Sequence, residues 1–116
     1  MLSLPPTVRV FIATGPADLR RSLDGLSALV REGMRGNPLS GHLFVFHNRR
    51  RDRAKVLYWD RSGLCLWYKR LEKGRFHFPE ADEPSLEVDA VDLSLLLEGI
   101  DLAGAKRRKR FEPAPR

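Results

Sequence analysis

The stretch from His42 to Pro79 constrains the fold more than any other part of the chain, because short apolar runs alternate in it with tight turns. Four runs have the length and composition of strands: His42–Asn48, Ala54–Asp60, Gly63–Leu71 and Arg75–Phe78. A crossover between parallel strands needs about a dozen residues, so turns this short permit only antiparallel neighbours. The stretch therefore predicts a β-meander.

The segments on either side of the meander predict one further strand and two helices. Thr7–Ala13 alternates as a half-buried strand does, and Gly15-Pro16 ends it. A helix is expected from Pro16 to about Met34, because one of its faces is apolar: Leu19, Leu23, Leu26, Val30 and Met34. A shorter helix is expected from Asp89, a favourable N-cap, to Gly99.

These elements indicate an α+β fold in one domain over residues 1–101. We expect a mainly antiparallel sheet of about five strands packed on one long amphipathic helix, with a short C-terminal helix and a basic tail. Residues 102–116 contain the run KRRKR and two prolines, so we expect this tail to be disordered until an anion orders it.

Basic residues concentrate in the turns of the meander. From Arg49 to Arg75 the chain has ten Lys or Arg against three acidic residues, in a chain whose net charge is +6. Aromatic residues alternate with these cations, and a basic surface with aromatics favours a nucleic-acid partner, DNA or RNA. Two alternatives stay open: the arginines only keep a small β-rich domain soluble, or they meet an acidic protein.

The residues expected to contact the phosphate backbone lie in the meander and in the tail. They are Arg49, Arg50, Arg51, Arg53, Lys55, Lys69, Arg70, Lys73, Arg75, Lys106, Arg107, Arg108, Lys109 and Arg110. Phosphate contacts position a protein without reading the sequence of the nucleic acid.

The C-terminal helix offers a second candidate surface. Its larger apolar face, the expected core contact, comprises Leu93, Leu96, Leu97 and Ile100. Val91 and Leu95 lie on the opposite side of the helix. These two residues are candidates for binding a protein partner, unless the helix is buried on both sides.

No catalytic residue, metal site or cofactor is expected. The histidines are not clustered as metal ligands are: His42, His47 and His77. The chain has no glycine-rich phosphate loop and no nucleophile elbow. A metal-dependent nuclease is the weak alternative, since its only candidate carboxylates sit at a helix start and in turns, where acids commonly stabilise local structure: Asp18, Asp52 and Asp60.

The compartment is indicated by what the chain lacks. Cys65 is the only cysteine, so no intrachain disulfide can form, and its apolar neighbours predict a buried thiol. No apolar run approaches the ~20 residues needed to span a bilayer, and the N-terminus does not read as a secretory signal. A cytoplasmic location is expected.

Five segments, taken in order, resemble a known family: DLRRSLDGL at 18–26, GHLFVF at 41–46, RRDRAKVLYWD at 50–60, GLCLWYKRLEKGRF at 63–76 and LSLLLEGI at 93–100. Together they are similar to the second-open-reading-frame proteins, called TnpB, of the bacterial insertion sequence 66 family. That family is unrelated to the RNA-guided nuclease of the same name. The resemblance covers about residues 5–101. The His77-Phe78-Pro79 sequence departs from it, because a Trp is expected before the proline.

The resemblance implies an accessory protein that is encoded beside a separate DDE-type transposase and is required, with another small protein of the element, for efficient transposition. Together with the basic surface and the lack of a catalytic motif, it predicts a non-enzymatic protein that binds DNA. The runner-up interpretation is a protein adaptor that makes no DNA contact. In it, Val91, Leu95 and the acidic segment Glu80–Asp101 dock the transposase, and the arginines meet an acidic partner surface.

Overall fold

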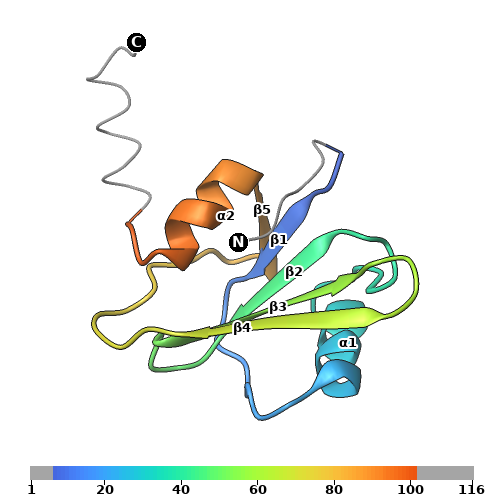
Figure 1. The fold of residues 1–116 in the computed structure, drawn as a ribbon, viewed down its shortest axis with the longest axis horizontal. Helices are drawn as coiled ribbons and strands as arrows, with labels where there is room; N and C mark the ends of the chain where they lie inside the picture. The colour runs from blue at the N-terminus through green and yellow to red at the C-terminus, as the bar shows by residue number, and fades with distance from the viewer. Residues whose placement is uncertain (1–6, 102–116) are drawn as a thin grey trace, which may run out of the picture.

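The structure is a computed structural model that describes residues 7–101, and its strands form one mixed sheet (Figure 1). The strands are β1 (Val10–Ala13), β2 (Leu43–His47), β3 (Arg53–Trp59), β4 (Leu64–Arg70) and β5 (Ser85–Val88). Their order across the sheet is β4-β3-β2-β1-β5. Strand β1 pairs in parallel with β2, and every other neighbouring pair is antiparallel.

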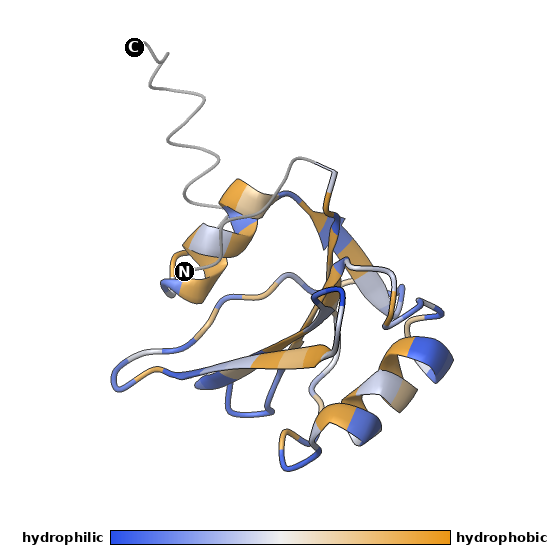
Figure 2. Ribbon diagram, turned by 45° about the vertical axis from the view of Figure 1, so that its right-hand side comes forward, coloured by the Kyte–Doolittle hydropathy of each residue, from blue (hydrophilic) through white to orange (hydrophobic). Residues whose placement is uncertain are grey.

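Two helices cover opposite faces of this sheet. Helix α1 (Leu23–Glu32) lies in the crossover from β1 to β2, and α2 (Ala90–Leu97) follows β5. Figure 2 shows the sheet between the two helices. We call the two sides of the sheet the α1 face and the α2 face.

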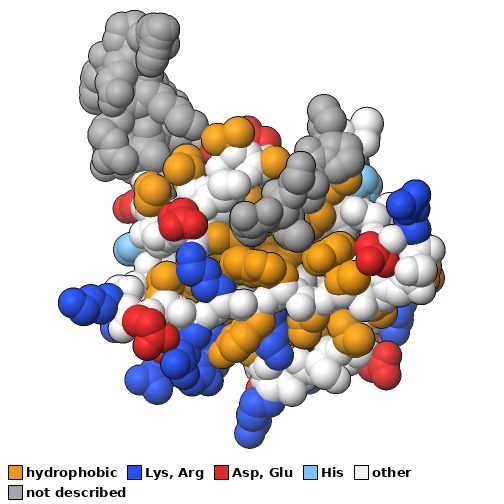
Figure 3. All heavy atoms as spheres, in the orientation of Figure 1, with side chains coloured by type: hydrophobic (Ala, Val, Ile, Leu, Met, Phe, Trp, Pro, Cys, Tyr) orange, Lys and Arg blue, Asp and Glu red, His pale blue; other side chains and the backbone are white. Residues whose placement is uncertain are grey.

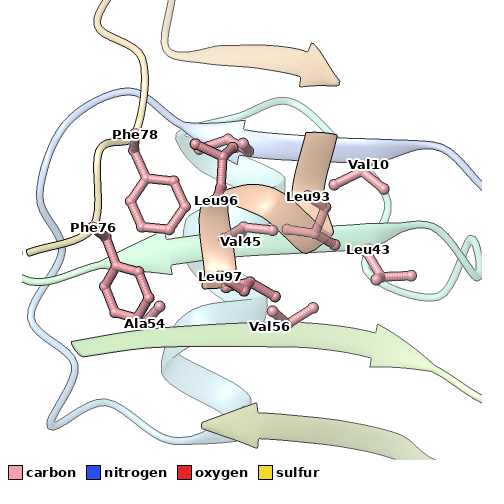
Figure 4. Packing of buried hydrophobic residues seen from close by; sticks show 11 residues of the cluster. Val10, Leu43, Val45, Ala54, Val56, Phe76, Phe78, Leu93, Leu96 and Leu97 are labelled. Atoms are coloured by element: carbon pink, nitrogen blue, oxygen red, sulfur yellow. The ribbon is translucent and has the colours of Figure 1, made fainter. Parts of the chain in front are cut away.

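The α2 face buries the larger cluster of apolar side chains. Helix α2 contributes Leu93, Leu96 and Leu97, all at most 1% exposed. They pack on inward-facing side chains of β1, β2 and β3 (Figure 4). The rings of Phe76 and Phe78, from the segment after β4, close one end of the cluster.

The α1 face buries a smaller cluster. Leu26 and Val30 of α1 pack against Phe44 and Phe46 of β2 and Leu57 of β3. This helix packs on β2, β3 and the first residues of β4, and the later part of the edge strand β4 stays open on this face, because Tyr68 and Arg70 are exposed. The two faces are therefore closed to different extents.

The expected fold class is wrong in two respects. The sheet is mixed, because the crossover through α1 returns the chain parallel to β1. No long helix is present in residues 7–101: α1 has ten residues and α2 has eight, one on each face. The meander of β2, β3 and β4 is antiparallel, as its short turns require.

Helix α1 begins at Leu23, later than the apolar pattern predicts, because side chains engage the preceding backbone. The Asp18 carboxylate accepts a hydrogen bond from the backbone N–H of Arg20 at 3.0 Å. The Lys55 ammonium donates to the carbonyl oxygens of Leu19 and Arg21, at 2.6 and 3.2 Å. These contacts hold residues 18–21 as a loop.

The predicted strand Arg75–Phe78 is also wrong. Gly74, at φ +79°, turns the chain after β4, and the next segment buries Phe76 and Phe78 on the α2 face instead of adding a strand beside β4. The chain then forms β5, which pairs with β1 at the other edge of the sheet and was not predicted. Cys65 is half-exposed on β4, so the expectation of a buried thiol is wrong too.

The C-terminal helix lies where its capping residue predicts. The Asp89 carboxylate accepts a hydrogen bond from the backbone N–H of Asp92 at 2.7 Å. Such N-caps satisfy a helix N–H group that has no partner within the helix. The predicted tail, residues 102–116, lies outside the described residues.

Candidate nucleic-acid interface

The side chain of Asn48 closes the turn between β2 and β3 through hydrogen bonds to other residues of that turn. Its Oδ1 accepts hydrogen bonds from the backbone N–H groups of Asp52 and Arg53, both at 3.1 Å. Its Nδ2 donates to Asp52 Oδ1 at 2.7 Å, and this hydrogen bond lowers the pKa of Asp52. Because these contacts close the turn, Arg49 and Arg50 are left exposed at its tip.

Arg51, in the same turn, is held by partners. Its backbone is left-handed, at φ +62°, and its guanidinium donates to Glu80 Oε2 at 2.6 Å. The guanidinium lowers the pKa of Glu80. The Arg51 carbonyl accepts a hydrogen bond from the backbone N–H of Phe76 at 2.6 Å. Arg51 therefore ties the turn to the segment that follows β4.

This tie brings two basic segments to one end of the sheet. The backbone N–H of Leu71 also donates to the carbonyl of Asp52, at 2.8 Å. We define the basic end as Arg49, Arg50, Arg53, Arg70, Lys73 and Arg75, all of which are exposed. Figure 3 shows Lys and Arg side chains gathered at lower left, where Figure 1 draws this end of the sheet.

The two lysines of the strands point to opposite faces. Lys55 lies on the α1 face and donates to the loop before α1, as described above. Lys69 lies on the α2 face, donates to the carbonyl of Leu97 at 2.8 Å and has Glu98 at 3.8 Å. Both ammonium groups thus bind the fold together, and neither belongs to the exposed basic end.

Two arginines face each other across the strands at the basic end. Arg53 of β3 and Arg70 of β4 are cross-strand partners on the α1 face. Arg70 donates to Glu72 at 3.0 Å, whereas the Arg53 guanidinium has no hydrogen-bond or ion-pair partner within residues 7–101. Like charges directly opposite are destabilising in a sheet. The pair therefore adds exposed positive charge to the α1 face at some cost in stability.

A hollow of about 420 Å³ adjoins these arginines on the α1 face. We call it the Tyr68 hollow. Its lining is Ala17, Asp18, Leu19, Arg20, Asn48, Arg53, Lys55, Leu66 and Tyr68. Asp18 is its one carboxylate, and the Arg20 guanidinium binds it at 2.9 and 3.0 Å and holds its pKa at about 2. Three cations against one paired anion leave the lining positive.

A profile of the family described as "IS66 Orf2 like protein" matches residues 8–107 of this chain. The chain belongs to the IS66 Orf2-like family. It is 41% identical over 106 residues to the uncharacterized protein y4jC of Sinorhizobium fredii (strain NBRC 101917 / NGR234), which covers 91% of each chain. It is 44% identical over 101 residues to the uncharacterized protein y4hO of the same strain, over 87% of this chain and 88% of that one. No solved structure matches.

The family is one of accessory proteins of insertion sequences, so the chain is transposition-associated. Within the described part of this IS66 Orf2-like chain, no three His, Cys, Asp or Glu side chains are grouped to hold a metal ion. The carboxylates considered for a nuclease serve local structure. Asp60, for example, accepts hydrogen bonds from the backbone N–H groups of Ser62 and Gly63 at 3.3 and 3.2 Å.

The two residues of the candidate partner surface on α2 differ in solvent exposure. Val91 is 60% exposed and lies beside Val8 and Val88, in a second hollow of about 710 Å³. Leu95 is only partly exposed. The two residues predicted for partner binding therefore differ: Val91 is accessible, and Leu95 is half-covered by its own domain.

The structure separates the residues predicted for nucleic-acid contact into three groups. Arg49, Arg50, Arg53, Arg70, Lys73 and Arg75 form the basic end. Arg51, Lys55 and Lys69 are engaged within the fold. Lys106, Arg107, Arg108, Lys109 and Arg110 lie outside the described residues.

Sequence reasoning did not single out two residues that line the Tyr68 hollow, Tyr68 and Arg20. Tyr68 is 50% exposed on β4 and pairs with Lys55 across the strands. The alternation of β4 could have revealed it, because Tyr68 and Arg70 share one face. Arg20 could not be found that way, since it reaches the hollow from the loop before α1.

Within residues 7–101 no helix has the length and apolarity needed to span a membrane.

Proposed function

We propose that this IS66 Orf2-like chain assists transposition as a non-enzymatic protein that binds DNA through its basic end. The observation that supports the proposal is the gathering of six exposed cations around the β2–β3 turn and the segment after β4. Two backbone hydrogen bonds, from Leu71 to Asp52 and from Phe76 to Arg51, hold these segments together. A preformed cationic end needs little reorganisation before it neutralises phosphates.

The electrostatic character of the basic end supports a polyanion over an acidic protein patch. Of its six cations, only Arg70 has an ion pair within the described residues, with Glu72. The remaining side chains are long, exposed and without a partner in residues 7–101. Such cations replace the counterions of a nucleic-acid backbone at low cost, and binding of that kind depends steeply on salt.

The test is a titration of the full chain against an element-end duplex and a scrambled duplex at two salt concentrations. We expect similar affinity for both duplexes, with a log–log salt slope near −0.9 for each phosphate neutralised. The combined variant Arg49→Gln, Arg50→Gln, Lys73→Gln should weaken binding to both duplexes about equally and reduce the slope.

A matched variant controls for net charge. Arg31→Gln, Arg35→Gln, Arg61→Gln removes the same three charges from exposed positions on α1, after it and in the β3–β4 turn. This variant should bind DNA almost as tightly as the parent chain. Equal losses in the two variants, or no binding at low salt, would exclude the basic end as the DNA site.

A second candidate function, docking of the transposase, is favoured by one observation. Val91 is a large apolar side chain left 60% exposed on α2, at a hollow whose lining mixes apolar and charged side chains. We expect Val91→Asp to weaken capture of the cognate transposase without lowering the melting temperature. Ser94→Asp is the matched control, because Ser94 is an exposed residue of the same helix. Unchanged capture by Val91→Asp would exclude this surface, and Leu95 is the less clear probe because it is half-buried.

A further inference from the structure

We propose that the Tyr68 hollow binds an unpaired nucleotide of single-stranded DNA, whose base stacks on the ring of Tyr68. The inference rests on the proposed DNA function and adds a substrate class to it. An accessory protein with this site would prefer an exposed single strand to an intact duplex.

Tyr68 is placed as a stacking platform. It lies on β4, an edge strand, so no further strand of the described chain covers its outer side. Half of its surface is exposed, and only Leu39 and Val91 are comparably exposed among the large apolar side chains of residues 7–101. The Lys55 ammonium lies over one face of the ring, 5.6 Å from its centroid, and is itself held by two carbonyl oxygens, so a base would stack on the other face.

Cations flank this ring on two sides. Arg53, the cross-strand partner of Arg70, lies next to Tyr68 on the same face. Arg20 reaches the hollow from the loop before α1, and its side chain is 91% exposed. A phosphate bound between Arg53 and Arg70 would relieve the repulsion between these two guanidinium groups.

The lining of the hollow favours an unpaired base. Leu66 of β4 contributes apolar surface to it, and residues of the loop before α1 form one wall. In a duplex the faces of each base are covered by its neighbours, so a ring in a hollow can stack only on a base that has left the helix. Base–aromatic stacking tolerates any sequence, because every base has a π-face.

The test compares single-stranded and duplex DNA with three forms of the full chain. The probe is an oligonucleotide of about 12 nucleotides that carries one 2-aminopurine, free or annealed to its complement. We expect the parent chain to bind the single strand more tightly and to change the 2-aminopurine fluorescence. Tyr68→Ala should weaken single-strand binding roughly 5- to 150-fold and abolish that change, whereas duplex binding stays within about twofold.

Tyr68→Phe is the matched control, because it keeps the ring and removes only the hydroxyl. It should bind the single strand as the parent chain does. Equal single-strand affinity of Tyr68→Ala and the parent overturns the inference. If duplex binding still depends on the basic end in that case, the proposed DNA function survives; if the parent chain binds neither form of DNA, both fail.

The other occupant to test is a second copy of the chain pairing along β4. Light scattering of the parent chain and Tyr68→Ala without DNA measures this directly. We expect the same mass for both. A parent dimer that Tyr68→Ala dissociates, with no change in single-strand affinity, would assign the exposed ring to self-association and overturn the inference.

Discussion

The two faces of the sheet differ in how they are closed. On the α2 face, three leucines of a short helix and two phenylalanines of a loop bury the centre and one end of the sheet. On the α1 face, a longer helix packs on β2, β3 and the first residues of β4 and leaves the basic end of the sheet open, where the Tyr68 hollow lies. The comparison teaches that a loop, not a helix, closes this end of the sheet on the α2 face, while the same end stays accessible to solvent on the α1 face.

Lys55 and Lys69 show the same contrast at the level of single side chains. Each lies on a strand at the basic end, and each donates to backbone carbonyls of the segment that covers its face. Lys55 binds a loop and Lys69 binds the end of α2. Because successive side chains of a strand point to opposite faces of the sheet, neighbouring cations contact different parts of the fold. A count of charges along the chain therefore overstates the free cationic surface.

The largest expected effect tests the role of the loop that closes the α2 face. Phe76 is fully buried, so Phe76→Ala removes a ring from a packed cluster and should cost about 3–5 kcal/mol of unfolding free energy. Chemical denaturation of the two proteins measures the difference. Arg75→Ala, at an exposed neighbouring position, should change stability by less than about 0.5 kcal/mol. A Phe76→Ala variant as stable as the parent would show that the loop does not close this face.

Much of the fold follows from the sequence, and the errors have physical causes. The turns at Arg49–Arg53 and Arg61-Ser62 predict the β2–β3–β4 meander because they are too short for a crossover. The strand predicted at Arg75–Phe78 has the right composition, but its two rings gain more by packing on the α2 face than by pairing at an edge. Such a choice depends on the assembled sheet, which local periodicity does not contain.

The second prediction compares the two lysines. Lys55→Met leaves the carbonyls of Leu19 and Arg21 without this donor, and should cost about 1–3 kcal/mol. Lys69→Met removes one donor at the end of α2 and should cost about 1 kcal/mol. Denaturant midpoints of both variants show which substitution lowers stability more.

Lys73→Met is the control for this pair, because Lys73 is exposed and has no hydrogen-bond or ion-pair partner within residues 7–101. Its midpoint should stay within about 0.5 kcal/mol of the parent. If Lys55→Met lowered stability as little as Lys73→Met, the loop before α1 would not depend on this lysine. Some other contact would then hold that loop as the wall of the Tyr68 hollow.

The candidate site was less predictable than the fold. Composition identifies Arg49, Arg50 and Arg53 as candidates, because exposed arginines in turns have few alternative roles. It also selects Lys55 and Lys69, whose tertiary hydrogen bonds cannot be read from sequence. Tyr68 reads as a core aromatic until the sheet order shows that β4 is an edge.

The smallest expected effect is a dependence of stability on pH, and it separates the two faces. His47 is buried on the α2 face, where its ring stacks on Phe78 at 5.0 Å between centroids. Its Nδ1 lies 3.2 Å from the carbonyl oxygen of Asn48, and its Nε2 has no hydrogen-bond partner within residues 7–101. Burial and the nearby Arg51 lower the pKa of His47 below its ordinary 6.5, although the Asn48 carbonyl and Glu80 oppose the shift.

A histidine with a lowered pKa in the folded state binds its proton more readily when the chain unfolds. Stability is therefore full above pH 6.5 and is lost as the pH falls from 6.5 toward the folded pKa. Asp18, on the α1 face, acts in another window: its pKa falls from 3.8 to about 2, so its contribution is lost only below about pH 4. Melting temperatures between about pH 7 and pH 5 should fall for the parent chain and for His77→Gln, which removes an exposed histidine, but fall less for His47→Phe. If the melting temperature fell equally with pH in all three proteins, protonation of His47 would not be the cause of the loss of stability.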